Sequence, residues 1–189
     1  RRPTGGRALL HHLELTYALA APLGAGPLPR ALQDAYRAIC GALVQALRSL
    51  GVAAELTPGE VNLELPSPHS AVPCFEAPAG GEVVVGGRKL AGSAMRAHGG
   101  AVLQHGAVLV GWDGRLQAGA LGLADDCVLR PRVTTLAAEL GRPPVGAELE
   151  EAVVGAFAAA LTAVFERGAL TPAERARAAE LEPSFRIDG

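Results

Sequence analysis

Two side chains of reactive type lie close together in a part of the chain that is rich in glycine and proline. Cys74 follows the proline-rich stretch 57–73, and Lys89, the only lysine of the sequence, lies within GGRKLAGSA. A free thiol has a pKa of about 8.5, so it becomes a good nucleophile near neutral pH only where a neighbouring cation favours the thiolate. Lys89 or His105 could supply this cation. Cys74 is therefore a candidate nucleophile.

Both residues also have ordinary structural interpretations. A free cysteine can pack as a small hydrophobic residue, and a single lysine on a strand can be a solvated surface cation. Lysine nevertheless differs from arginine in being a compact charge that can lose its proton, so its retention in an arginine-rich chain is suggestive. From position alone, both interpretations stay open for Cys74 and Lys89. Cys40, within a helical pattern, and Cys127, next to two aspartates, are expected to be structural.

A second glycine-rich segment opens the chain. RRPTGGR, residues 1–7, sets a glycine turn between arginines, so backbone N–H and guanidinium groups could approach a carbonyl or phosphate oxygen. The segment lacks the G-K-[ST] ending of a Walker P-loop and the GxGxxG spacing of a dinucleotide site. His11 and His12 follow it without HxH or HExxH spacing, so we expect no metal site.

Composition limits the classes of function. The formal net charge of −2 gives no general affinity for nucleic acid or anionic membranes, so neither partner is expected. The apolar runs are shorter than the ~20 residues of a membrane span. Three cysteines without a CxxC pair argue against a disulfide framework and a structural zinc, and favour a reducing, cytoplasmic setting. We expect a single domain over 1–189, and because the chain begins without Met, one that lacks its N-terminal part.

Hydrophobic periodicity predicts an α+β fold in which helices flank antiparallel or mixed β-sheets. Glycine pairs between the later strands have the positive φ preference of tight hairpins, and the Gln-His-Gly sequence at 104–106 is expected to form a turn. The expected strands cover 8–20, 52–56, 82–86, 88–96 and 101–111. The expected helices cover 28–50, 131–141, 146–168 and 170–182, the last with Thr171 as N-cap.

Four motifs, RRPTGGRALLHH, CFEAP, GGRKLAGSAMR and LQHGAVLV, together resemble the lipoate/octanoate protein ligase-transferase family, which is related in fold to biotin protein ligases. The resemblance implies a biotin/lipoyl protein ligase-like catalytic domain in which Lys89 approaches the acyl carbonyl oxygen. It also implies an acyl pocket. The residues that it assigns to this pocket are Arg1, Arg2, Thr4, Gly5, Gly6, His11, Gly92, Ser93, Ala94, Gln104, His105 and Gly106.

Two branches of this family differ at the position of Cys74. Lipoate ligases usually carry an Asn-Asp pair before the lysine strand, which helps to place ATP and magnesium, whereas this chain has CFEAPAGGEVVV. That stretch resembles the cysteine-dependent octanoyltransferases of Gram-positive-type bacteria. The resemblance implies that Cys74 takes octanoyl from acyl carrier protein as a thioester, without a cofactor. The resemblance also implies that Cys74 then passes the group to a lysine of a lipoyl domain, such as a glycine-cleavage H protein or a dehydrogenase E2 domain.

Three alternatives stay open at this point. The chain could be an ATP-dependent lipoate-protein ligase, which would need ATP and magnesium, or an amidotransferase that moves octanoyl between lipoyl domains. It could also be a non-catalytic module that binds lipoyl domains. Met95 stands where the family often has Gln, and Gly80 and Gly81 replace a common Trp-Tyr. These departures concern the shape of the acyl pocket and leave Cys74 and Lys89 in place.

Overall fold

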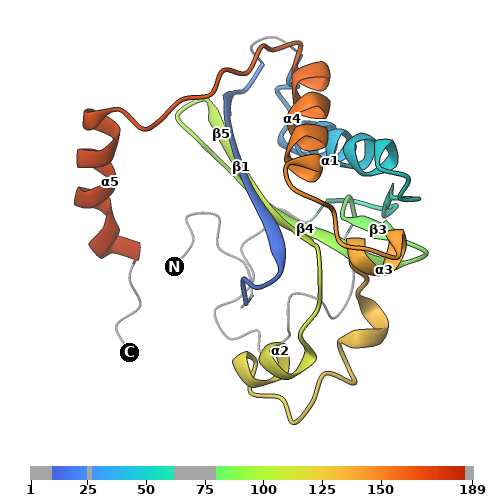
Figure 1. The fold of residues 1–189 in the computed structure, drawn as a ribbon. Coiled ribbons are helices and arrows are strands. Elements are labelled where there is room, and N and C mark those ends of the chain that lie inside the picture. Colours follow the sequence, from blue (N-terminus) through green and yellow to red (C-terminus); the bar gives the residue numbers. More distant parts are fainter. Residues whose placement is uncertain (1–9, 25–26, 62–79, 186–189) are drawn as a thin grey trace.

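The computed structural model describes residues 10–24, 27–61 and 80–185 of the chain. Their centre is an antiparallel five-stranded sheet with the strand order β1-β5-β4-β3-β2. The strands are β1 (Glu14–Pro22), β2 (Glu55–Leu56), β3 (Val83–Val85), β4 (Arg88–His98) and β5 (Ala101–Leu109). Helices α1 (Leu32–Ser49) and α4 (Glu148–Leu161) lie together on one side of the sheet, as Figure 1 shows. The predicted α+β class is confirmed.

Helix α1 supplies most of the core that covers this side of the sheet. Ile39, Leu43 and Leu47 recur at helical spacing and are fully buried, which stabilises the fold by about 1.5–3 kcal/mol for each side chain. Gly51 follows the helix with a φ of +90°, a conformation that glycine adopts without the strain of a Cβ. The helix predicted for 28–50 is confirmed, with its start shifted to Leu32.

Two glycine pairs connect the strands that carry the candidate site. Gly86 and Gly87, with φ values of +54° and +74°, join β3 to β4, and Gly99 and Gly100, at +58° and +79°, join β4 to β5. Two-residue hairpin turns of the favoured type require positive φ at both positions. The glycine pairs therefore form the two hairpin turns that the sequence predicted.

The C-terminal helices differ from their predicted lengths. The helix predicted for 146–168 ends at Leu161, because Thr162 takes the left-handed conformation and the chain beyond it is exposed. Helix α5 (Pro172–Phe185) is exposed over its whole length and lies away from the sheet (Figure 1). Its start was predicted correctly. Thr171 Oγ1 accepts from the Glu174 N–H, while Glu174 Oε2 accepts from the Thr171 N–H, a capping box.

The segment between β5 and α4 holds the largest deviations from the predicted elements. Helix α2 (Gly114–Ala120) was missed, although Asp113 caps it by accepting from the Leu116 N–H at 3.0 Å. The helix predicted for 131–141 is split into a 3-10 turn at Arg130–Arg132 and helix α3 (Leu136–Leu140). Val133 forms a parallel bridge to Lys89 instead of continuing a helix.

The first two strands are also displaced from their predicted ranges. The strand predicted for 8–20 runs from Glu14 to Pro22, and the one predicted for 52–56 is reduced to Glu55–Leu56. The glycine turn of RRPTGGR lies outside the described residues. None of the helices in the described ranges is both long enough and apolar enough to cross a membrane.

Candidate active site

Two of the motifs singled out in the sequence lie on neighbouring strands and pair directly. Ser93 is opposite Gly106, Ala94 is opposite His105, and Met95 is opposite Gln104. The Gln-His-Gly sequence therefore belongs to the middle of β5, and its prediction as a turn was wrong. Glycine is present at 106 for close packing rather than for a turn.

The candidate residues divide between the two faces of the sheet. Side chains of successive residues alternate in direction along a strand. The face that packs against α1 and α4 receives Ser93, Gln104 and Gly106. The opposite face receives Gly92, Ala94 and His105. The sequence motifs thus supply one set of residues to the core and another to the face opposite α1 and α4.

Lys89 joins the face opposite α1 and α4 through an irregularity in β4. Val84 pairs with Lys89 but Val83 pairs with Ala91, so Leu90 has no partner of its own across the strands. Residues three apart point to opposite faces of a regular strand, and one extra residue reverses this. A Cβ built on Gly92 would lie 3.0 Å from the Lys89 Cε, which places the lysine side chain beside Gly92.

The Lys89 side chain is buried and paired with a carboxylate. It is 1% exposed, and its Nζ lies 2.5 Å from Oε1 of Glu82, whose side chain is 11% exposed. Lysine is almost never fully buried without a partner. The interpretation of Lys89 as a solvated surface cation is therefore wrong, because it lies in the interior.

Backbone contacts hold both members of this ion pair. Glu82 donates its N–H to Thr57 Oγ1 at 2.9 Å, and its carbonyl oxygen accepts from the Thr57 N–H at 2.8 Å. On the other side, the Lys89 carbonyl accepts from the Thr134 N–H at 2.9 Å, next to the bridge with Val133. The backbones of Glu82 and Lys89 are therefore each tied to another segment of the chain, at Thr57 and at Thr134 respectively.

Glycine at position 92 leaves room for the Lys89 side chain, and glycine at position 106 lets β5 pack closely against β4 and Tyr17. A Cβ at Gly92 would come 3.3 Å from the Lys89 Nζ in addition to its contact with Cε. A Cβ at Gly106 would lie 2.5 Å from the Gly92 carbonyl oxygen and 2.8 Å from both Ser93 Oγ and the Tyr17 ring. Real Cβ atoms do not approach so closely, so any larger residue at 106 would displace β4.

A network of hydrogen bonds lies between α1 and the face of the sheet that packs against it. Tyr17 Oη lies 2.7 Å from Ser93 Oγ, and Gln104 Nε2 donates to Tyr17 Oη at 2.8 Å and to Cys40 Sγ at 3.3 Å. Burial raises the pKa of the Cys40 thiol to about 11. Cys40 therefore stays a neutral thiol, as expected for a structural residue.

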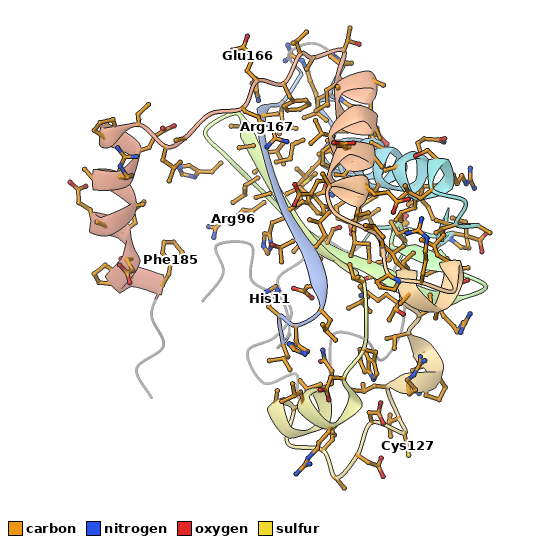
Figure 2. All side chains as sticks on the ribbon, in the orientation of Figure 1. His11, Arg96, Cys127, Glu166, Arg167 and Phe185 are labelled. Carbon is orange, nitrogen blue, oxygen red and sulfur yellow. The ribbon has the colours of Figure 1, made fainter. Side chains whose placement is uncertain are left out.

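The remaining predicted site residues lie elsewhere or outside the described part. His11 precedes β1 and pairs with Glu14, and its side chain is 52% exposed. Cys127, which was expected to be structural, is exposed in the loop after α2 and does not pack in the core (Figure 2). Cys74 and the residues assigned to the pocket at Arg1, Arg2, Thr4, Gly5 and Gly6 lie outside the described residues. The acyl-binding roles of His11 and of the residues at the start of the chain, and the nucleophilic role of Cys74, stay predictions.

Sequence reasoning gave no role to Glu82 or Tyr17. There was a weak indication for Glu82 in the sequence, because an acidic residue stands directly before three valines. Two residues before Val84, it is expected on the same face of the sheet as Val84 and Lys89. Tyr17 had none, since its contacts join strands that are far apart in the chain. Among the described residues, no group of three or more His, Cys, Asp or Glu side chains is arranged to hold a metal ion.

This arrangement can stabilise a negative charge. A buried ammonium interacts more strongly with a developing anion than an exposed one does, because the surrounding medium is less polar than water. The ammonium of Lys89 is held beside the backbone of Gly92, on the same face of the sheet as Ala94 and His105. Such a group suits reactions in which a carbonyl oxygen gains charge, acyl transfer among them.

Comparison with known proteins agrees with this chemistry. The family model described as the lipoyl protein ligase A/B catalytic domain matches residues 1–158. The chain is 38% identical to the octanoyltransferase LipM of Kyrpidia tusciae, covering 100% of this chain and 72% of that protein. It is also 38% identical to LipM of Symbiobacterium thermophilum, covering 96% of this chain and 68% of that protein. Because these relatives are named octanoyltransferases, the predicted resemblance to this class of enzyme is confirmed.

Solved structures show the same fold. A bipartite lipoate protein ligase from Thermoplasma acidophilum, described together with its E2 lipoyl domain, matches with a TM-score of 0.72 and 26% identity over 96% of this chain. An ATP-bound lipoate-protein ligase A matches with a TM-score of 0.66 and 23% identity over 89% of this chain. The chain spans 64% and 60% of the length of these two proteins.

Proposed function

The chain belongs to the lipoyl protein ligase A/B catalytic domain family, and within it we propose an octanoyltransferase that carries octanoyl as a thioester on Cys74. The donor would be octanoyl acyl carrier protein and the acceptor a lysine of a lipoyl domain. The relatives named octanoyltransferase support the reaction class, and the lipoyl domain described with the archaeal ligase supports the class of acceptor.

The observation that carries this proposal is the burial of the single lysine. Lys89 is 1% exposed, ion-paired, and set beside Gly92 within the GRKLAGSA motif. Holding a charged lysine inside a protein is costly, so a chain that places its only lysine there has a use for the charge. Stabilising the oxygen of a tetrahedral intermediate is such a use.

The chemistry divides into two balanced steps. In the first, the Cys74 thiolate attacks the octanoyl thioester of the carrier, a new C–S bond forms, and the carrier leaves as its thiolate. In the second, the neutral amine of the acceptor lysine attacks the octanoyl carbonyl, a C–N bond forms, and Cys74 leaves and takes up the proton. Both steps pass through an oxyanion that the Lys89 ammonium can stabilise. Exchange between thioesters is close to thermoneutral, so the first step needs no ATP.

A transfer assay without nucleotide tests this function. The full chain is mixed with octanoyl acyl carrier protein and a lipoyl domain, and the mass of the lipoyl domain is followed by mass spectrometry. We expect the lipoyl domain to gain one octanoyl group, at a rate that added ATP and magnesium do not change. Transfer that requires ATP and free octanoate would contradict the proposal and support the lipoate ligase alternative.

A second donor separates the transferase from the amidotransferase. An octanoylated lipoyl domain is supplied in place of the acyl carrier protein, with an unmodified lipoyl domain of different mass as acceptor. We expect faster transfer from the carrier protein, because a thioester is a more reactive acyl donor than an amide. Faster transfer from the octanoylated domain would assign the amidotransferase activity instead.

A further inference from the structure

A buried carboxylate at the start of β1 has one oxygen without a donor in the described part of the chain. The Glu14 side chain is 4% exposed, and its Oε1 is in contact with Nδ1 of His11. Its Oε2 is buried and has no hydrogen-bond partner among the residues that the structure describes. Buried polar atoms are nearly always hydrogen-bonded, because an unsatisfied one destabilises the folded state. Glu14 therefore offers a buried acceptor to a donor that is still to be identified.

The turn before β1 holds this carboxylate in place. Leu13 has a φ of +53°, a left-handed conformation that a bulky residue keeps only where its surroundings impose it. Its carbonyl oxygen accepts from the N–H groups of Val110 and Gly111, both at 2.9 Å, which ties the turn to the end of β5. His11 and Glu14 lie on either side of this residue and meet in a side-chain contact. The turn thus places His11 on one oxygen of Glu14 and leaves the other for a donor that the described residues do not supply.

Glu14 shares a face of the sheet with Lys89. The neighbouring Leu15 packs against the core that α1 supplies, and successive side chains of a strand alternate, so Glu14 lies on the opposite face. Lys89 lies on that face beside Gly92. Strand β5 runs between β1 and β4, so Glu14 and Gly92 are separated by two strand spacings, roughly 10 Å across the sheet. The carboxylate and the lysine are therefore on one face, on either side of β5.

A row of small residues crosses the sheet between these two groups. Thr16 of β1 is opposite Ala107 of β5, and Ala107 is opposite Gly92 of β4. A ligand that reached both Glu14 and Lys89 would cross this row, where the side chains are short enough to let it approach the backbone. The two functional groups and the row between them are thus arranged for one ligand that has a polar atom at each end of the contact.

The inference that follows rests on the proposed function, whose second step needs an amine in a defined orientation. Lys89 would stabilise the acyl oxygen, and the acceptor amine must reach the carbon of the same carbonyl. We propose that Glu14 Oε2 accepts an N–H of the acceptor lysine and so binds this amine next to the acyl carbonyl. An amine that donates an N–H to Glu14 has its free electron pair on another side of the nitrogen, where it can attack. No proton passes to Glu14, so the balance of the second step is unchanged.

The chemistry of the unsatisfied atom selects this ligand. A carboxylate oxygen accepts hydrogen bonds and binds nitrogen donors strongly, so it suits an amine and does not suit the apolar octanoyl chain. A metal ion would need several ligands, and the described ranges hold no group of three or more His, Cys, Asp or Glu side chains arranged for one. Of the groups that react in the proposed cycle, the acceptor amine is the one that brings N–H donors.

A double-mutant cycle on binding tests this contact without any acyl group. The full chain and its Glu14→Gln variant are each titrated by calorimetry with an unmodified dehydrogenase E2 lipoyl domain. The titrations are repeated with the same domain after its acceptor lysine is replaced by methionine. For the wild type we expect the methionine to weaken binding by about tenfold or more, and for Glu14→Gln by much less. Glu148→Gln, which changes an exposed ion pair, should respond as the wild type does.

Two results would overturn the inference, and a third separates it from the proposed function. Equal affinity of the wild type for the lysine and methionine domains overturns it, whether or not Glu14→Gln folds. An equal loss of affinity in the wild type and in a folded Glu14→Gln also overturns it, because another group would then bind the lysine. If the coupling is present but the lipoyl domain gains no octanoyl group in the transfer assay without nucleotide, the proposed function is wrong and the binding role of Glu14 stands.

Discussion

Two ion pairs of this molecule have similar contacts and very different surroundings. The Lys89–Glu82 pair, with an N–O distance of 2.5 Å, has side chains that are 1% and 11% exposed. The Arg142–Glu148 pair, at 2.9 Å, has side chains that are 51% and 33% exposed. The first joins the residue before β3 to strand β4 at the candidate site, and the second joins the loop after α3 to the first turn of α4.

The comparison shows that burial decides what an ion pair does. Around Arg142 and Glu148, water solvates both charges, so the pair contributes little to stability. Around Lys89 and Glu82, little water reaches the charges, so the loss of one of them should cost more stability than at the exposed pair. The exposed pair can be lost at little cost, while the buried pair couples the stability of the fold to the chemistry of the site.

The largest effect is expected for Lys89→Met. Loss of the ammonium removes the group that stabilises the oxyanion, so kcat/KM for octanoyl transfer should fall by about 10²–10³-fold. Steady-state transfer to a lipoyl domain measures this, with far-UV circular dichroism to confirm the fold. Arg142→Met is the matched control at the exposed pair, and equal loss of activity in both variants would refute the distinction between the pairs.

Glu82→Gln is expected to reduce stability strongly. A buried ammonium without its carboxylate destabilises the folded state, by about 3 kcal/mol for a pair of this kind. Urea unfolding followed by circular dichroism measures the difference. The double variant Glu82→Gln/Lys89→Met lacks both charges of this pair and should recover part of this loss. If the free energy of unfolding falls in the double variant by the sum of the decreases in the two single variants, the two residues are not coupled.

Gly92→Ala tests the space beside the lysine. The added methyl group would come 3.0 Å from the Lys89 Cε and would move the ammonium by a few tenths of an ångström or more. Misplacement of a stabilising charge should lower kcat/KM by about tenfold. Gly119→Ala in α2, where a Cβ has nothing within 4 Å, serves as the control and should keep full activity. Unchanged activity in Gly92→Ala would mean that Lys89 does not need this position.

The smallest effect is expected for Glu148→Gln. Hydrogen bonds from the Arg142 guanidinium and the Val145 N–H lower the pKa of Glu148 to about 2, from its usual 4.5. A lowered carboxyl pKa stabilises the folded protein at pH values above the usual pKa of 4.5. This stability is lost as the pH falls from about 4.5 to about 2. Because the pair is exposed, the melting temperature of the variant at neutral pH should equal that of the wild type within experimental error. A large drop would show that exposure does not weaken this pair.

Much of the fold followed from local sequence rules. The apolar spacing of α1, the glycine pairs of the two hairpins and the Thr171 cap of α5 all depend on residues that are neighbours in the chain. The errors have physical reasons. Thr162 ends α4 although apolar residues continue beyond it, and residues 104–106 lie within β5 although they contain a glycine.

The candidate site was predictable only in part. Lys89 stood out because it is the only lysine, and its motif pointed to an acyl carbonyl. The partner Glu82 and the unpaired Leu90 that turns Lys89 towards Gly92 depend on how β3 pairs with β4, which no local pattern reports. The contacts of Tyr17 with Ser93 and Gln104 likewise join separate strands.

The central claim is that Cys74 carries the octanoyl group, and intact-mass spectrometry of the full chain tests it most directly. The chain is incubated with octanoyl acyl carrier protein, without ATP and without a lipoyl domain, and then measured under acidic conditions that preserve thioesters. The account predicts one octanoyl adduct in the wild type and in Cys127→Ala, which changes an exposed thiol, and none in Cys74→Ala. An adduct that persists in Cys74→Ala would contradict it.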